Sequence, residues 1–148
     1  MKRIRLLVML GAVAVALPLG LTTAKATGTT GGTGTANVSI NQYADFDTAG
    51  TNIDVGLNVS CTGESVIDVT LKQTYPETGS PVTVGSGPQP LVACDGRTHS
   101  VGVTVFGVGF DTGKAFATAT VLGAPTEVGG EPGPVKATAS RWVIIRQV

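Results

Sequence analysis

The clearest pattern in the chain is an alternation of apolar and polar residues between positions 52 and 61. Every second side chain in this stretch is apolar: Ile53, Val55, Leu57, Val59 and Cys61. A period of two over ten residues is typical of a β-strand that buries one face. We therefore expect a half-buried strand here, with these five side chains in the core.

Shorter stretches repeat the alternation, and no segment shows a helical period. We expect further strands at about 36–43, 67–72, 90–94, 101–105, 114–122 and 135–147, with an edge piece at 82–84. Turn-favouring residues such as Asp95-Gly96 separate them. Seven or eight short strands predict an all-β domain at 36–148, an immunoglobulin-like antiparallel β-sandwich. A small Greek-key barrel is the alternative.

The N-terminus departs from this pattern and is typical of an export signal. Basic residues at positions 2, 3 and 5 precede an apolar run at 6–21, and Ala24-Lys25-Ala26 is a small-x-small cleavage site. The run is shorter than the ~20 residues that span a bilayer, which disfavours a retained membrane anchor. We expect a signal peptide at 1–26, a secreted mature chain and no membrane association afterwards.

Removal of the signal peptide changes the charge of the protein. Residues 27–35 contain only Thr and Gly, which have little apolar surface to bury, so we expect a flexible tether. The whole chain is neutral, with 10 Lys and Arg against 10 Asp and Glu. The mature chain keeps six bases and ten acids, a net charge of −4. This charge repels nucleic acid and anionic membranes, and we expect neither as a partner.

The two cysteines, Cys61 and Cys94, are expected to form a disulfide in an exported chain. Cys61 ends the strand at 52–61, and Cys94 ends the expected strand at 90–94. In an antiparallel path these strand ends lie at the same end of the sandwich, which favours the bond. Free redox thiols are the alternative, but the chain has no Cys-x-x-Cys spacing.

Residues that carry catalysis are scarce. The mature chain has one His, His99, and no Met, so we expect no transition-metal site and no cofactor. Asp95, His99 and Ser100 suggest a Ser-His-Asp set, but neighbouring residues of a strand point to opposite faces. We therefore expect His99 to be an ordinary residue at a strand end and the protein not to be an enzyme.

Three carboxylates are candidates for a calcium site at one end of the domain: Asp45, Asp47 and Asp111. Carboxylate oxygens are the ligands that Ca²⁺ prefers. Two of these residues lie in similar short sequences, Phe46-Asp47-Thr48 and Phe110-Asp111-Thr112, which we expect at equivalent corners of the fold. The alternative is that each Asp stabilises a turn.

The C-terminal segment 141–148 contains the only Trp of the chain. Trp142 and Ile144 lie on one face of an expected strand, and Val143 and Ile145 lie on the other. One pair can therefore be exposed, and an exposed aromatic strand serves as an interaction surface. Trp142 and Ile144 are the candidate residues, and a core strand flanked by charge is the alternative.

Three motifs connect the domain with other proteins: Cys61 at a strand end, Ala93-Cys94-Asp95-Gly96 before a strand of alternating Val, and Phe-Asp-Thr-Gly-Lys-Ala-Phe-Ala at 110–117. With them, segment 36–148 resembles small exported proteins of unknown function from high-GC Gram-positive bacteria. The resemblance implies an immunoglobulin-like sandwich and no assigned activity. The domain is more distantly similar to exported apo-proteins that carry enediyne chromophores, which have two disulfides.

These observations predict a secreted, non-catalytic domain that serves as an extracellular interaction or structural module. Its partner would be an extracellular protein or a small ligand. The alternatives are a carrier of a small molecule or carbohydrate, and an inhibitor of an exported hydrolase that presents the loop at 123–134 or at 76–90. A pocket lined by Trp142 and Phe side chains would favour the carrier, and a filled core would contradict it.

Overall fold

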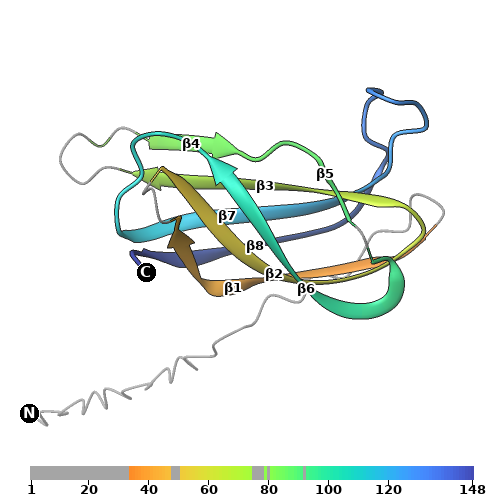
Figure 1. Cartoon of the computed structure of the whole chain (residues 1–148), viewed down its shortest axis with the longest axis horizontal. Helices are drawn as coiled ribbons and strands as arrows, with labels where there is room; N and C mark the ends of the chain where they lie inside the picture. The colour runs from red at the N-terminus through yellow and green to blue at the C-terminus, as the bar shows by residue number, and fades with distance from the viewer. Residues whose placement is uncertain (1–33, 48–50, 75–78, 80, 92) are drawn as a thin grey trace, which may run out of the picture.

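A computed structural model of the chain describes residues 34–47, 51–74, 79, 81–91 and 93–148. They form eight strands (Figure 1): β1 (Ala36–Phe46), β2 (Asn52–Thr62), β3 (Ser65–Thr74), β4 (Pro81–Gly85), β5 (Gln89–Pro90), β6 (Asp95–Phe106), β7 (Gly113–Gly123) and β8 (Val135–Arg146). The described residues include no helix long and apolar enough to cross a membrane. The expected signal peptide and the tether up to residue 33 lie outside the described residues.

The strands show the expected alternation of buried and exposed side chains. In β2 the five predicted side chains are buried, and the residues between them are half-buried or exposed. β7 follows the same rule with small residues, since Ala115, Ala117 and Ala119 are buried. The period of two therefore predicts correctly which side of β2 and of β7 faces the core.

The prediction of a strand at 90–94 is wrong. The strand residues here are only Gln89 and Pro90, which pair with Ile67 and Val66 of β3. The N–H of Leu91 donates one further backbone hydrogen bond to the Ser65 carbonyl. The chain then leaves β3, because Cys94 is bonded to Cys61 at the end of β2.

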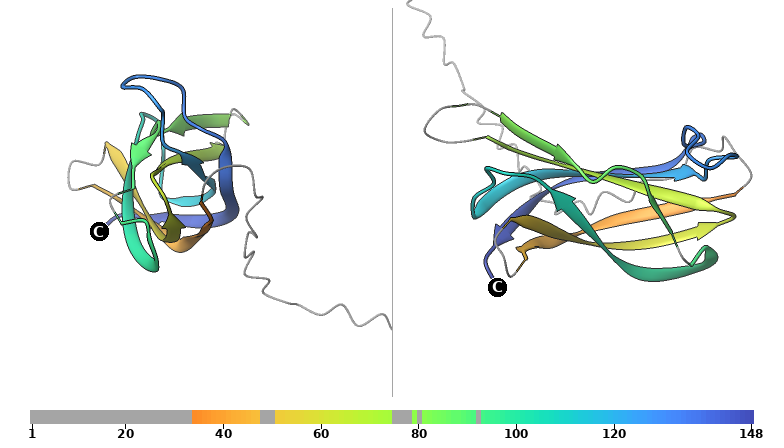
Figure 2. Two further views of the ribbon diagram at one scale, coloured as in Figure 1. Left: turned by 90° about the vertical axis from the view of Figure 1, so that its right-hand side faces the viewer. Right: turned by 45° about the horizontal axis from the view of Figure 1, so that its top comes forward.

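The strands form one mixed sheet in the order β4-β3-β7-β8-β1-β2-β6, and β5 pairs separately with β3. All neighbours are antiparallel except β1 and β8, which run parallel over Tyr43–Asp45. β1 therefore joins two halves, β4-β3-β7-β8 and β2-β6. Figure 2 shows that the sheet curls around a central axis into a half-barrel. The all-β prediction is confirmed, but the strands form a continuous curled sheet instead of two separate ones.

The inside of the curled sheet is filled by small and aliphatic side chains. Every described hydrophobic residue of the buried core is an Ala, Val, Ile or Leu, apart from Cys61. Phe46 and Phe110 pack against the core only in part. Among the described residues, no Phe, Tyr or Trp is fully buried, which is unusual because aromatic side chains commonly dominate cores.

The predicted disulfide is confirmed, and its surroundings differ from the expectation. Cys61 and Cys94 are bonded, with their Cα atoms 4.5 Å apart. Cys94 does not end a strand but directly precedes β6, whose first residue Asp95 pairs with Thr62 of β2. The bond thus joins the end of β2 to the start of its antiparallel neighbour. In the described part of the chain, Thr35 also reaches this end, because its N–H donates to Thr62 Oγ1 at 2.8 Å.

Candidate functional site

The outer side of the curled sheet carries a group of large apolar side chains, Phe116, Trp142, Ile144 and Tyr43, which we call the aromatic face. They come from three adjacent strands. Phe116 of β7 lies opposite Trp142 of β8, and Ile144 of β8 lies opposite Tyr43 of β1. Directly opposed residues project to the same side of a sheet, so the four side chains are neighbours.

Trp142 is the centre of the aromatic face. Its ring centroid lies 5.3 Å from that of Phe116, with the two ring planes at 65°, an edge-to-face contact. Trp142 remains 64% exposed and Tyr43 45% exposed. Val143 and Ile145, on the other side of β8, are fully buried. The structure thus places Trp142 and Ile144 together on the outer side, although Ile144 is half-buried.

Basic residues surround the aromatic face. Lys72 of β3 lies opposite Phe116, and Lys114 of β7 lies opposite Ile144. The Arg146 guanidinium lies 4.6 Å from the centre of the Tyr43 ring, within cation–π range. These positions give the face a positive rim on a domain that we expect to be acidic as a whole.

Arg146 is also paired with an acid. Its side chain donates to both carboxylate oxygens of Asp45, the neighbouring residue on β1. This hydrogen bond raises the pKa of Arg146 above its already high usual value. The pair holds the guanidinium in place over Tyr43.

Arg141 holds β1 and β8 together where their pairing begins. The pairing of β1 with β2 shifts its register between Ile40 and Ala44, and β1 meets β8 only from Tyr43 onward. Arg141 Nη1 donates to the Ile40 carbonyl at 2.8 Å. The charged side chain next to Trp142 thereby stabilises the strand junction on which the aromatic face rests.

The three carboxylates proposed for calcium have separate partners. Asp45 pairs with Arg146, and the Asp111 carboxylate accepts a hydrogen bond from the Thr112 N–H. Asp47 accepts hydrogen bonds from the backbone N–H groups of Thr51 and Asn52. The Thr51 N–H is the main reason why the pKa of Asp47 lies below its usual value. Across the described ranges, no three His, Cys, Asp or Glu residues form a group that could hold a metal ion.

Part of the suggested Ser-His-Asp set is present. His99 Nε2 lies 2.8 Å from Asp95 Oδ1, and this hydrogen bond lowers the pKa of Asp95. Ser100 points to the other side of β6 and donates its hydroxyl to Asn58 Oδ1 at 3.0 Å. The hydroxyl therefore faces away from the imidazole, as the alternation of strand residues predicts.

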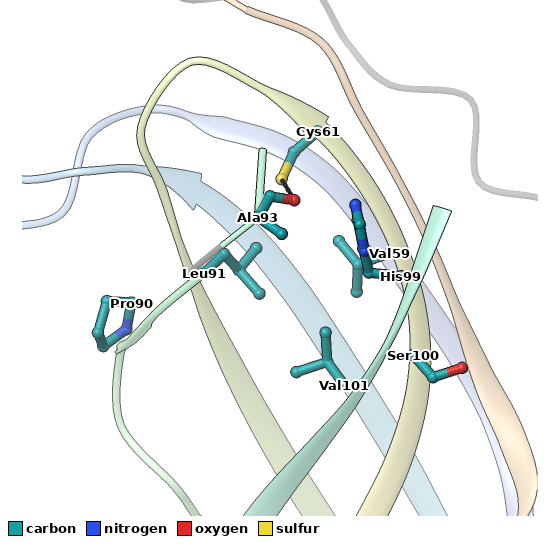
Figure 3. A pocket seen from close by; sticks show the side chains of 8 residues that line it. All are labelled: Val59, Cys61, Pro90, Leu91, Ala93, His99, Ser100 and Val101. Atoms are coloured by element: carbon teal, nitrogen blue, oxygen red, sulfur yellow. Dashed lines mark hydrogen bonds between the residues drawn. The ribbon is translucent and has the colours of Figure 1, made fainter. Parts of the chain in front are cut away.

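A pocket of about 300 Å³ lies between β2, β6 and the segment that leads from β5 to β6 (Figure 3). Leu91, Val59 and Val101 point toward its interior, and His99 lies at its edge. The lining contains no Phe, Tyr or Trp. The sequence did not predict this pocket, because the position of the pocket depends on where the chain leaves β3 between β5 and β6.

A second pocket, of about 570 Å³, lies beside the turn between β2 and β3 and is lined in part by Lys136. Lys136 is only 4% exposed. Its Nζ donates to the carbonyls of Thr62 and Glu64 and to Ser65 Oγ at 2.9–3.2 Å. Three acceptors use the three protons of the ammonium group, so Lys136 has no donor left for a ligand.

No protein-family model matches the chain, and no curated protein matches it either.

Proposed function

We propose that the protein is an exported, non-catalytic binding domain that contacts another extracellular protein through the aromatic face. The observation that carries the proposal is the distribution of aromatic side chains. No Phe, Tyr or Trp among the described residues is fully buried, while Trp142 and Tyr43 are exposed on adjacent strands. An exposed aromatic group is costly in water unless another surface covers it.

The chemistry of the face favours a protein partner. Trp, Tyr and Arg are the residues that most often contribute binding energy in protein–protein interfaces, at the centre of a patch. Here Trp142 contacts Phe116, and Tyr43 lies opposite Ile144 under the guanidinium of Arg146. Lys72 and Lys114 on the rim favour a partner whose facing surface is acidic.

Two further features support a binding role over catalysis or transport. The hydroxyl of Ser100 is bonded to Asn58 on the side of β6 away from His99. The described core is filled by aliphatic side chains, and Trp142 lines neither of the two pockets. These features favour contact at a surface over a nucleophile–base pair or a carrier with an aromatic-lined cavity.

We also infer that the half-barrel is a member of the immunoglobulin-like class. The support is the order of neighbouring strands. β1, β2 and β6 match the A, B and E strands of that class, and β3, β7 and β8 match its C, F and G strands. The expected signal peptide and the disulfide support export, because disulfides persist in oxidising compartments.

The proposal is tested by site-specific photo-crosslinking in the full chain, in the cells that produce it. A photoreactive residue replaces Trp142 in one version and Val128 in another. Val128 is a matched control because it is also exposed but lies on the loop between β7 and β8. We expect a discrete protein adduct from position 142 and none from position 128. No adduct from 142 would overturn the proposal, and an adduct from 128 alone would favour the inhibitor hypothesis.

A further inference from the structure

The half-barrel has a seam where its two edges meet, and the seam is closed at one end only. The edges are β6 on one side and β4 with β5 on the other. At the closed end Gly107 touches Val84, and a Cβ atom on Gly107 would lie only 2.3 Å from a Val84 methyl carbon. At the other end the pocket of about 300 Å³ separates β6 from the segment that follows β5.

The pocket at the open end is an uncovered part of the core. Val59 lies at its base and is almost fully buried, while Leu91 and Val101 are half-buried. Figure 3 shows Leu91 and Val101 converging on the space from opposite sides of the seam. An opening of this size, with Leu91, Val59 and Val101 in its lining, has room for one large apolar side chain.

The rim of the pocket is an unpaired strand edge. β6 forms a ladder with β2 and with no other described strand. Every second residue of β6 therefore directs its N–H and C=O groups into the seam. Between Thr98 and Phe106 this edge contains no Lys and no Pro, the residues that commonly protect an edge from pairing.

A positive charge lies at the open end of the same edge. Arg97 is exposed and lies two residues before His99 on β6, beside the register shift at the start of the β2–β6 pairing. The nearby Asp95 carboxylate already accepts hydrogen bonds from His99 and from the Arg97 N–H. Within the described part of the chain, ion pairs join only His99 to Asp95 and Arg146 to Asp45. The Arg97 guanidinium is therefore available to an acidic group of a ligand.

From these three observations we propose that the seam binds an extended peptide segment of another protein as an added strand along β6. The segment places one apolar side chain between Leu91, Val59 and Val101, and it places a carboxylate near Arg97 two residues away. Backbone pairing gives affinity in strand addition, and the pocket gives specificity. The tether of this chain does not fit, because residues 27–33 contain only Thr and Gly. The site is separate from the aromatic face.

The test is amide hydrogen exchange on the full chain with three blocked peptides. The first is Thr-Val-Thr-Leu-Thr-Asp-Thr, which directs Val, Leu and Asp to one face. The second replaces Leu with Asn, and the third replaces Asp with Asn. We expect the first peptide to slow exchange of alternate amides in 97–103 at least tenfold. The Leu-to-Asn peptide should give no protection, and the Asp-to-Asn peptide should bind several-fold more weakly.

Variants locate the binding site. Ala93→Phe fills the pocket from its exposed side and should weaken binding at least tenfold, while Val128→Phe on the distant loop should change nothing. Arg97→Gln should remove the preference for the Asp peptide over its Asn version. Trp142→Ala should leave peptide binding unchanged, which separates this site from the proposed function of the aromatic face.

Three results would overturn the proposal. The first is the absence of protection in 97–103 with the Leu-Asp peptide. The second is equal binding of the Leu-to-Asn peptide, which would mean that the pocket is not used. The third is protection of 97–103 that rises with protein concentration and needs no peptide, since this would assign the edge to a second copy of the chain.

Discussion

The two sides of β7 and β8 have opposite compositions. On the inner side, Ala115, Ala117, Val143 and Ile145 are fully buried. On the outer side, Phe116 contacts Trp142, which is largely exposed. A tightly curled sheet brings its inner faces close together, and small side chains meet that geometry. The difference indicates that the large side chains are not needed to build the fold.

We therefore expect the inner side to stabilise the fold and the outer side to contribute to the proposed binding. Burial of the inner side contributes about 25 cal/mol for each Å² of apolar surface removed from water. The outer side chains gain much less in the free protein, since Trp142 stays 64% exposed. Substitutions on the two sides should therefore have different consequences, and adjacent residues provide matched pairs.

The largest effect is expected for Ile145→Ala. Ile145 is 1% exposed, and its truncation leaves a cavity in the core. The free energy of unfolding should fall by about 2–5 kcal/mol. Ile144→Ala, one residue away on the outer side, should cost less than about 1 kcal/mol. Urea unfolding of both variants measures the difference, and equal losses would mean that the two sides of β8 are packed alike.

An intermediate effect is expected from enlarging an inner residue. Ala117 is fully buried on β7, and Leu at this position has no space. Ala117→Leu should destabilise the protein by about 1–3 kcal/mol through overpacking. Thr120→Leu, on the outer side of the same strand, should leave the thermal midpoint nearly unchanged. A tolerated Ala117→Leu would show that the inner side does not require small residues.

A similar loss of stability is expected when Lys136, the one buried cation among the described residues, is replaced. Lys136 donates to the carbonyls of Thr62 and Glu64 and to the Ser65 hydroxyl. Lys136→Met keeps the length of the side chain but leaves these acceptors without a donor, at a cost of about 1–3 kcal/mol. Lys114→Met, on the exposed rim, is the control. If chemical denaturation shows the same small loss for both, the Lys136 hydrogen bonds do not stabilise the fold.

The smallest change in stability is expected for a substitution of Asp47, which directly follows β1 and lies on neither side of β7 and β8. Hydrogen bonds from Thr51 and Asn52 lower the pKa of Asp47 below its usual value of 3.8. The ionised carboxylate thus stabilises the folded state above pH 3.8, and this contribution is lost as the pH falls through the lowered pKa. Asp47→Asn should reduce stability at pH 7, and the deficit should shrink in acid. A deficit that is constant from pH 7 to pH 2 would contradict this explanation.

Local patterns predicted the inner side well. The alternation from Ile53 to Cys61 correctly identified the buried residues of β2, because the side-chain period of a strand depends only on neighbours in sequence. The start of β6 was misplaced, since Thr98, His99 and Ser100 carry no apolar alternation although they pair with β2. Strand pairing supplied the information that local polarity lacked.

The candidate site was predictable in part. Trp142 and Ile144 were identified by their spacing, and Phe116 could have been added because it alternates with Ala115 and Ala117. Tyr43 reaches the aromatic face only through the parallel pairing of β1 with β8, which joins residues about 100 positions apart. The single curled sheet depends on this same long-range pairing, so the local pattern of residues could not predict it either.

The most direct test of the binding proposal is the accessibility of aromatic side chains in the producing culture. Hydroxyl-radical labelling of the full chain is compared between the purified protein and the growing culture. Val128, which is fully exposed on the loop between β7 and β8, is the internal control. We predict that Trp142 and Tyr43 label readily in the purified protein and are protected in the culture, while Val128 labels equally in both. Equal labelling of Trp142 in the two samples would contradict the proposal that a partner covers the aromatic face.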